Sequence, residues 1–160
     1  MANTYTQIYL HVIFAVKDRE SLIKPEVENT LHAYLASALR HRGHHPIAIN
    51  GMADHIHLLI GLNPGEALSS LVQSLKIESS KWMKGEGKCR MFAWQSGYAA
   101  FSYSASMKPK VEAYIARQKE HHAHHDFNAE MAEFLRLSGL EYDENYRLRA
   151  VSYESPGPKL

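Results

Sequence analysis

The stretch of residues 45–62, HPIAINGMADHIHLLIGL, contains two runs rich in aliphatic residues, one on each side of Ala53-Asp54. Such runs are typical of strands, and a two-residue connection is the length that favours a tight hairpin turn. Asn63-Pro64-Gly65 then interrupts the second run. We therefore expect paired strands at 45–52 and 55–62.

The segments around this hairpin alternate between strand and helix patterns. Residues 4–16 are rich in β-branched and aromatic side chains and predict a first strand. Strand, helix, strand, strand, helix, strand is the order of a ferredoxin-like split β-α-β sandwich. The sequence thus predicts an α+β fold with an antiparallel sheet and extra C-terminal helices. The remaining expected elements are helices at 25–42, 67–83, 108–121 and 129–137, and a strand-like region at 92–104 interrupted at Gly97.

Length and composition favour one domain. A chain of 160 residues with 45% apolar residues can bury its own core. We expect this domain over residues 1–150 and a disordered tail over 151–160, where Gly157 lies between two prolines. The single cysteine, Cys89, excludes an intramolecular disulfide, so a cytoplasmic protein is the default. The apolar run at 8–14 is too short for a membrane span and lacks the basic leader of a signal peptide.

Two histidines, His55 and His57, lie on the second strand of the hairpin. Side chains at i and i+2 of a strand point to the same face, so the two imidazoles project together while Ile56 points to the opposite layer. Two adjacent imidazoles on a rigid strand favour a divalent metal site. Chance pairing of surface histidines is the alternative.

Tyr114 and Gln118 are separated by four residues on the expected helix at 108–121, which places them on one face. A tyrosine can attack phosphorus and form a covalent intermediate, and a nearby cation would help its phenol to ionise. A glutamine carbonyl oxygen can complete the coordination of a hard cation. A packing role is the alternative for Tyr114, because the chain has nine tyrosines.

Together these residues resemble a known family. His55-Ile56-His57 is similar to the HUH motif, and residues 114–118, YIARQ, resemble the single-tyrosine motif of small insertion-sequence transposases and repeat-associated tyrosine transposases. The resemblance spans roughly residues 3–147 and includes further stretches at 5–11, 50–55, 94–98, 118–122 and 141–143.

The resemblance implies a transposase that nicks and rejoins single-stranded DNA at hairpin-bearing element ends. It implies Tyr114 as the nucleophile, a 5′-phosphotyrosine intermediate, and His55, His57 and Gln118 as metal ligands. The expected cofactor is magnesium or manganese, and imidazole ligands suit manganese better. The implied partners are DNA and a second copy of the chain, whose tyrosine helix can complete the site, and the implied location is the nucleoid of a bacterial or archaeal cell.

Basic residues offer contacts to DNA phosphates. The overall balance, 18 Lys and Arg against 17 Asp and Glu, argues against a protein coated in positive charge. Single strands are held by basic grooves with aromatic platforms, and a basic segment precedes Phe92 and Trp94. A solvated helix face for the basic residues, and core positions for the aromatic ones, are the alternatives. The candidates are Lys76, Lys81, Lys84, Arg90, Lys108, Lys110 and Arg117.

Other interpretations lead to different functions. A domesticated relative could use the same chemistry on chromosomal repeats. A regulator that only binds single-stranded DNA would not need Tyr114 and the histidine pair, and an unrelated metal-binding protein or hydrolase would not need Tyr114. The histidine-rich run at 121–125 favours surface or helix-end positions over a second metal site.

Overall fold

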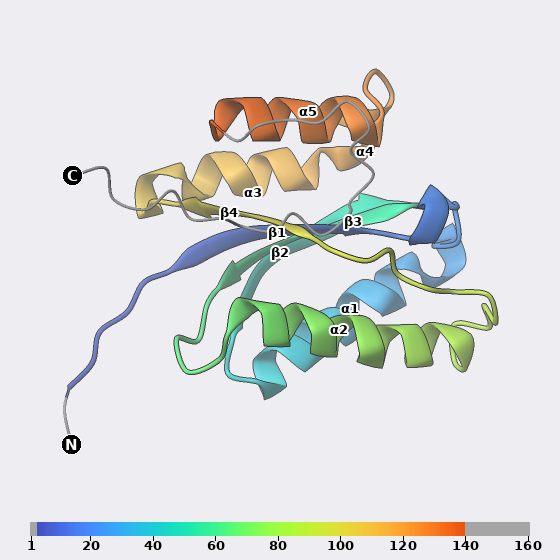
Figure 1. Ribbon diagram of the computed structural model, residues 1–160, viewed down its shortest axis with the longest axis horizontal. Helices are drawn as coiled ribbons and strands as arrows, with labels where there is room; N and C mark the ends of the chain where they lie inside the picture. The colour runs from blue at the N-terminus through green and yellow to red at the C-terminus, as the bar shows by residue number, and fades with distance from the viewer. Residues whose placement is uncertain (1–2, 140–160) are drawn as a thin grey trace.

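The computed structural model describes residues 3–139, which form a four-stranded antiparallel sheet with helices on both faces (Figure 1). The sheet order is β2-β3-β1-β4, and every neighbouring pair is antiparallel. β3 is therefore inserted between β1 and β2, which is the split β-α-β arrangement that the sequence predicts. The strands are β1 (Tyr9–Ala15), β2 (His45–Met52), β3 (His55–Gly61) and β4 (Ala99–Tyr103).

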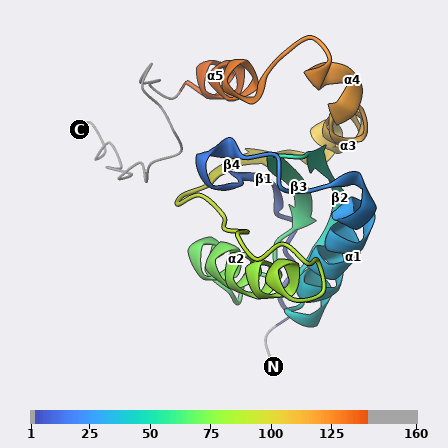
Figure 2. The same cartoon turned by 90° about the vertical axis from the view of Figure 1, so that its right-hand side faces the viewer.

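Two groups of helices cover the two faces of the sheet (Figures 1 and 2). One face carries α1 (Pro25–His41) and α2 (Leu68–Lys84). The other carries the three helices that follow β4, which confirms the expected C-terminal additions: α3 (Lys108–Ala116), α4 (Gln118–His122) and α5 (Phe127–Leu137). Two short 3₁₀ turns are η1 (Lys17–Arg19) and η2 (Ala105–Met107). Within residues 3–139, no helix has the length and apolarity to cross a bilayer.

Alternation along the two central strands divides the core in two. Phe14 on β1 and Ile56 and Leu58 on β3 are fully buried in the cluster that α1 and α2 cover. The alternate positions, such as Ile13 and Leu59, pack in the clusters formed with α3 and α5. The histidine pair of β3 shares this second face, so it lies under the C-terminal helices.

Three predicted elements differ from the structure. β1 and β4 are shorter than the predicted strands at 4–16 and 92–104, and Trp94 forms only an isolated bridge with Val16. The prediction of a single helix over 108–121 is wrong, because the helix is interrupted at Arg117, which has the non-helical dihedral angles φ −99° and ψ 21°. The predicted tail at 151–160 and the domain end at 150 lie outside the described residues.

A side chain from β2 accounts for the break at Arg117. The Asn50 amide nitrogen donates to the carbonyl oxygens of Ile115 at 2.9 Å and Ala116 at 3.3 Å. These are among the last carbonyls of α3, which lack partners within the helix. Because Asn50 on β2 gives these carbonyl oxygens hydrogen-bond donors, α3 can end at Ala116. A separate helix, α4, begins at Gln118.

Gly51 is the position in β2 where a larger residue should disturb the hairpin most. A Cβ at this position would lie 2.9 Å from the Ile56 Cα and even closer to the His55 carbonyl oxygen, both of them backbone atoms. We expect Gly51→Ala to lower the free energy of unfolding by about 3 kcal/mol, because strands β2 and β3 must separate to admit the methyl group. Urea denaturation followed by circular dichroism measures this change.

Gly65→Ala is the matched control for this substitution. Its Cβ would meet only the Asn63 side-chain oxygen at 3.3 Å, in a loop. The free energy of unfolding of Gly65→Ala should stay within about 0.5 kcal/mol of the wild-type value. Equal stabilities for the two variants would contradict the close approach of the strands at Gly51.

Candidate active site

His55 and His57 lie side by side on β3, with their ring centroids 5.1 Å apart. Both are almost completely buried, at 1% and 0% exposure. The strand is internal, with β2 and β1 bonded to its two edges, so its backbone is held on both sides. The prediction that the two imidazoles share a face is confirmed.

Each of the two imidazoles has a partner that orients its ring. His55 Nδ1 lies 2.7 Å from Asp54 Oδ1, so Nδ1–H donates to the carboxylate and Nε2 points away from Asp54. That Nε2 is buried and has no hydrogen-bond partner. His57 Nδ1 lies 2.7 Å from His11 Nε2 on β1, and burial lowers the pKa of His57 to about 4. The His57 ring is therefore held neutral, the form that binds metals.

Tyr114 on α3 reaches this pair within the same chain. Its ring centroid lies 6.1 Å from that of His57, and its hydroxyl donates to Glu130 Oε2. Burial and the neighbouring Glu130 carboxylate raise the pKa of Tyr114. The phenol is therefore protonated here, and a positive charge close by would be needed to favour its ionised form.

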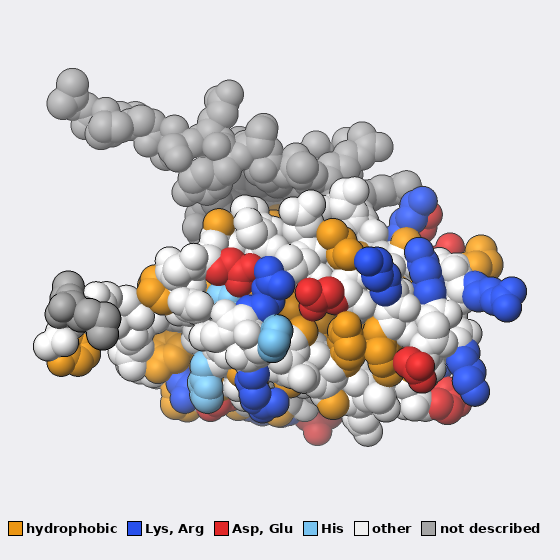
Figure 3. Space-filling view, turned by 90° about the horizontal axis from the view of Figure 1, so that it is seen from below, with side chains coloured by type: hydrophobic (Ala, Val, Ile, Leu, Met, Phe, Trp, Pro, Cys, Tyr) orange, Lys and Arg blue, Asp and Glu red, His pale blue; other side chains and the backbone are white. Residues whose placement is uncertain are grey.

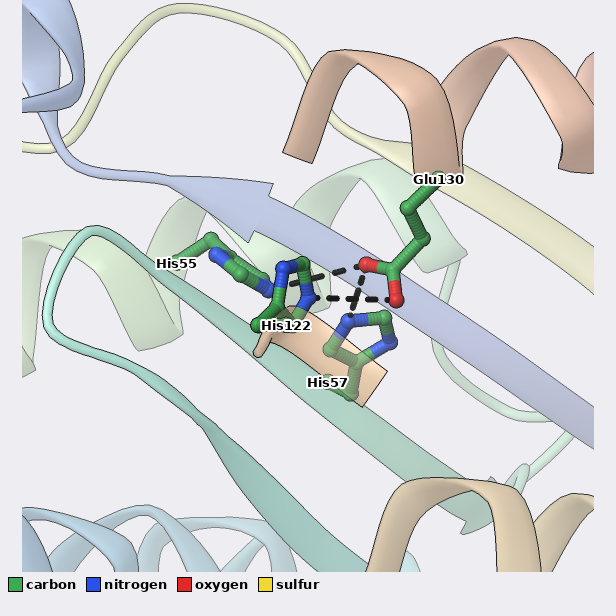
Figure 4. A group of neighbouring side chains, drawn as sticks. All are labelled: His55, His57, His122 and Glu130. Atoms are coloured by element: carbon green, nitrogen blue, oxygen red, sulfur yellow. Dashed lines mark hydrogen bonds and ion pairs between the residues drawn. The ribbon is translucent and has the colours of Figure 1, made fainter. Parts of the chain in front are cut away.

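Glu130 on α5 occupies the centre of the group (Figure 4). Its side chain is 1% exposed, and its oxygens lie 2.8 Å from His57 Nε2, 3.6 Å from His55 Nε2 and 3.2 Å from His122 Nε2. Burial acts to raise the pKa of Glu130, but hydrogen bonds from His122, His57 and Tyr114 hold it well below its usual range. Glu130 is thus a buried, ionised carboxylate between the histidines and the tyrosine.

Gln118, at the start of α4, is fully buried in the same region. Its Oε1 accepts a hydrogen bond from His122 Nε2 at 3.0 Å, and its Nε2 is buried without a partner. The four side chains that the sequence singles out therefore all lie in one region of one chain. Gln118 and Tyr114 lie on two short helices rather than on one.

Three side chains of this group escape the sequence reasoning: His11, His122 and Glu130. His11 stands out only as a polar residue within the apolar run of β1. His122 belongs to the histidine-rich run and lies at the end of α4, one of the two expected positions, but its side chain is only 6% exposed. Glu130 lies among the apolar residues of α5 that face the sheet, and a buried-face acidic residue is the signal that could have found it.

These residues fit a divalent metal ion. His55, His57, His122 and Glu130 each offer one ligand atom, and these atoms all lie within 4.8 Å of one another. Around a metal with bonds of about 2.1 Å, opposite ligand atoms are separated by roughly 4.2 Å, so small movements would suffice. The unpartnered Nε2 of His55 is the clearest sign of a missing partner.

A cavity of about 610 Å³ opens beside Tyr114 and Glu130. Tyr103 and Phe134 line it with aromatic surface, and Lys110 adds a cationic group. The volume is within the range of small-molecule sites.

The basic candidates occupy several different places. Only Lys110 lines the cavity at Tyr114. Lys76 is half-buried, and its ammonium donates to the carbonyl oxygens of Gln95, at 2.8 Å, and Gly97. Burial lowers the pKa of Lys76 to about 8. Lys76 thus holds the loop before β4.

The other five candidates lie outside the cavity. Lys108 lies over the ring of Tyr9, and Arg117 donates to the Ala113 carbonyl oxygen of α3. Lys81, Lys84 and Arg90 are exposed on α2 and the segment after it, on the opposite side of the sheet from Tyr114. Seen from that side, basic side chains are interspersed with acidic ones (Figure 3).

Comparisons with known proteins agree on one family. The pattern of the family described as "Transposase IS200 like" matches residues 4–118. The ISDra2 transposase TnpA of Deinococcus radiodurans is 27% identical over 120 residues, which cover 71% of this chain and 86% of that protein.

Two solved structures share the fold. A Deinococcus radiodurans R1 protein named as a transposase superposes with a TM-score of 0.57 at 24% identity, over 74% of this chain and 96% of that one. A REP-associated tyrosine transposase, solved bound to a REP hairpin, superposes with a TM-score of 0.58 at 15% identity, over 76% and 73%. At these identities the likeness concerns the fold alone.

Proposed function

Because the chain belongs to the IS200-like transposase family, we propose that it nicks and rejoins single-stranded DNA at hairpin-bearing element ends through a 5′-phosphotyrosine intermediate. Membership of a transposase family makes it a DNA-cleaving enzyme. We further propose that the substrate is single-stranded DNA with a hairpin and that the intermediate is a covalent tyrosine–DNA link. The catalytic domain is proposed to span residues 1–150.

The main support for this proposal is that Tyr114 lies next to the histidine pair. The tyrosine hydroxyl and His57 Nε2 bind the two oxygens of the same carboxylate, Glu130. The proposed nucleophile and the candidate metal site therefore lie next to one another within one chain. This arrangement suits phosphoryl transfer, in which positioning and charge stabilisation do most of the work.

The proposed reaction has two balanced steps. Tyr114 Oη loses its proton and attacks the scissile phosphorus; the Oη–P bond forms, the P–O3′ bond breaks, and the leaving oxygen becomes a 3′-hydroxyl. A 3′-hydroxyl then attacks a phosphotyrosine, which restores a phosphodiester and frees the tyrosine. No nucleotide cofactor is needed, because each bond broken is replaced by one of the same kind.

We assign the metal ligands to His55 and His57, with Gln118 as the third. A bound divalent cation would polarise the scissile phosphate and stabilise negative charge on the tyrosine oxygen. Both magnesium and manganese can serve, and manganese is favoured by the imidazole nitrogens. The buried Nε2 of His55, which faces the cluster without a partner, supports this assignment.

Hairpin DNA is the proposed partner, and the proposal places the protein with the nucleoid. A relative of the same fold is described as bound to a REP hairpin. A homodimer is also proposed from the family resemblance. Because Tyr114 meets the histidine pair within one chain, sharing of active sites between subunits is not required for the chemistry.

Covalent capture tests the proposed function directly. The purified protein is incubated with end-labelled single-stranded DNA from the sequences flanking its own gene, with Mn²⁺ or with EDTA, and run on a denaturing gel. We expect a denaturant-resistant protein–DNA adduct only with Mn²⁺ and only on strands that contain a hairpin. Hairpin binding without an adduct would instead indicate a DNA-binding regulator.

Lys81 and Lys84 provide a separate test of hairpin binding. We expect the double change Lys81→Ala/Lys84→Ala to weaken binding and to lower the slope of log K against log salt by about 1.5, because two phosphate contacts are lost. The matched control is Lys17→Ala/Lys24→Ala, which removes the same charge from two exposed lysines elsewhere. Equal binding by the two double variants would exclude Lys81 and Lys84 from the DNA interface.

A further inference from the structure

The face of α5 that contacts the sheet is apolar except for one carboxylate. Phe127, Met131 and Leu135 are buried against β1 and β4 at the spacing of one helix face. Glu130 lies on this face between them and is 3% exposed. An ionised carboxylate in such a position is unfavourable unless cations or hydrogen-bond donors surround it.

Glu130 is surrounded by imidazole nitrogens rather than by Lys or Arg. Its Oε1 faces His57 Nε2 at 2.8 Å and His55 Nε2 at 3.6 Å. Its Oε2 faces His122 Nε2 at 3.2 Å and also accepts from the Tyr114 hydroxyl. The Nε2 of the half-buried His121 also lies 3.3 Å from Oε2. Of these nitrogens, those of His55, His57 and His122 form with Glu130 one compact group of possible ligand atoms (Figure 4).

Partners outside this group orient two of the three rings. Asp54 accepts a hydrogen bond from His55 Nδ1–H, and His11 Nε2 is hydrogen-bonded to His57 Nδ1 at 2.7 Å. In both rings the other nitrogen, Nε2, is directed at Glu130. An imidazole whose far nitrogen is fixed by a carboxylate is the usual arrangement around protein-bound metals, and His55 has this arrangement.

We propose that Glu130 and His122 are ligands of the metal ion, together with His55 and His57. Adjacent ligand atoms on one ion with bonds of about 2.1 Å lie about 3 Å apart, which is the range of the Glu130 contacts. Gln118 Oε1, 3.0 Å from His122 Nε2, is at the same spacing and is compatible with a further position. The proposal rests on the proposed function only in that the site holds a divalent cation.

The two added ligands lie beyond the end of the family match. The family match ends at residue 118, before His122 and Glu130. α4 and α5 would therefore supply part of the metal site of this chain, and Glu130 would join the ion to the nucleophile through its second oxygen. α5 is then required for metal binding as well as for covering the sheet.

Metal titration tests this proposal without DNA. EDTA-treated full-length protein is titrated with Mn²⁺ by calorimetry, and circular dichroism and thermal unfolding in EDTA check the fold of each variant. We expect one Mn²⁺ per chain, and a Kd raised at least about tenfold in Glu130→Gln and in His122→Ala. The controls Glu133→Gln, on the exposed side of α5, and His124→Ala should bind as the wild type does. If Glu130→Gln does not fold, Glu130→Asp keeps the charge on a shorter side chain and should also bind more weakly.

Several results would overturn the proposal. Glu130→Gln could bind Mn²⁺ as tightly as the wild type or more tightly, while His55→Ala no longer binds Mn²⁺. In that case Glu130 is not a ligand but competes with Mn²⁺ for the histidine nitrogens, and the proposed function does not depend on Glu130. Unchanged Mn²⁺ binding in His122→Ala would show that His122 is not a ligand. If the wild type does not bind Mn²⁺, neither Glu130 nor His122 is a ligand, and the proposed metal site is also wrong. Binding that depends on Glu130, combined with no adduct on hairpin DNA, would support the metal site and contradict the proposed function.

Discussion

We expect Tyr114→Phe to lower the rate of covalent adduct formation by at least about 10³-fold, because removal of a nucleophile leaves only binding and electrostatic effects. Phe keeps the ring that packs near His57 and removes only the hydroxyl that donates to Glu130. The fold and the metal site should persist. Quantifying adduct on denaturing gels against time measures the loss, and Mn²⁺ titration and hairpin binding should remain as in the wild type.

Tyr103→Phe is the control for that prediction. Tyr103 is half-buried and lines the same cavity as Tyr114, and burial raises its pKa. Its hydroxyl makes no contact with Glu130 in the described hydrogen bonds, so this variant should form adduct at the wild-type rate. Adduct in Tyr114→Phe, or equal loss in both variants, would show that Tyr114 is not the nucleophile.

The fold could be predicted because its information is local. The period of β3 places Ile56 and Leu58 on one face and the histidine pair on the other, and the structure keeps that division. The short connection at Ala53-Asp54 predicts that β2 pairs with β3. The helix break at Arg117 could not be predicted in this way, because Asn50, some 65 residues earlier in the chain, satisfies the end of α3.

The site was only half predictable for the same reason. A motif such as His55-Ile56-His57 is visible because its geometry is set by one strand. His11, His122 and Glu130 reach the site from three other elements, and only tertiary packing brings them together. Their residue types alone are ambiguous, since a histidine in a strand or a glutamate in a helix is more often unrelated to a metal site.

His57→Ala should have the largest effect on stability, because His57 supports buried groups on both sides. Its Nδ1 bonds His11 and its Nε2 bonds Glu130, at 2.7 and 2.8 Å. Alanine would leave a buried carboxylate and a buried imidazole with one partner fewer each, and a cavity between them. We expect the free energy of unfolding of the metal-free protein to fall by about 3–5 kcal/mol. The melting temperature should fall by about 10 °C.

His55→Ala separates this structural effect from metal binding. The Nε2 of His55 has no partner and its Nδ1 bonds the half-buried Asp54, so its loss should lower stability by about 2 kcal/mol or less. Both alanine variants should lose the stabilisation that Mn²⁺ gives to the wild type. Thermal melts with and without Mn²⁺ measure the two effects, and equal destabilisation in EDTA would contradict this difference between the two histidines.

A double variant identifies the source of the instability. If the charge of Glu130 causes it, Glu130→Gln should recover part of the stability lost in His57→Ala, since a neutral amide is less costly to bury without its partner. The double-mutant cycle should then give a coupling of about 1–3 kcal/mol between the two positions. Additive effects would mean that the cavity, not the unpaired carboxylate, dominates, and that His57 and Glu130 are not held together by charge.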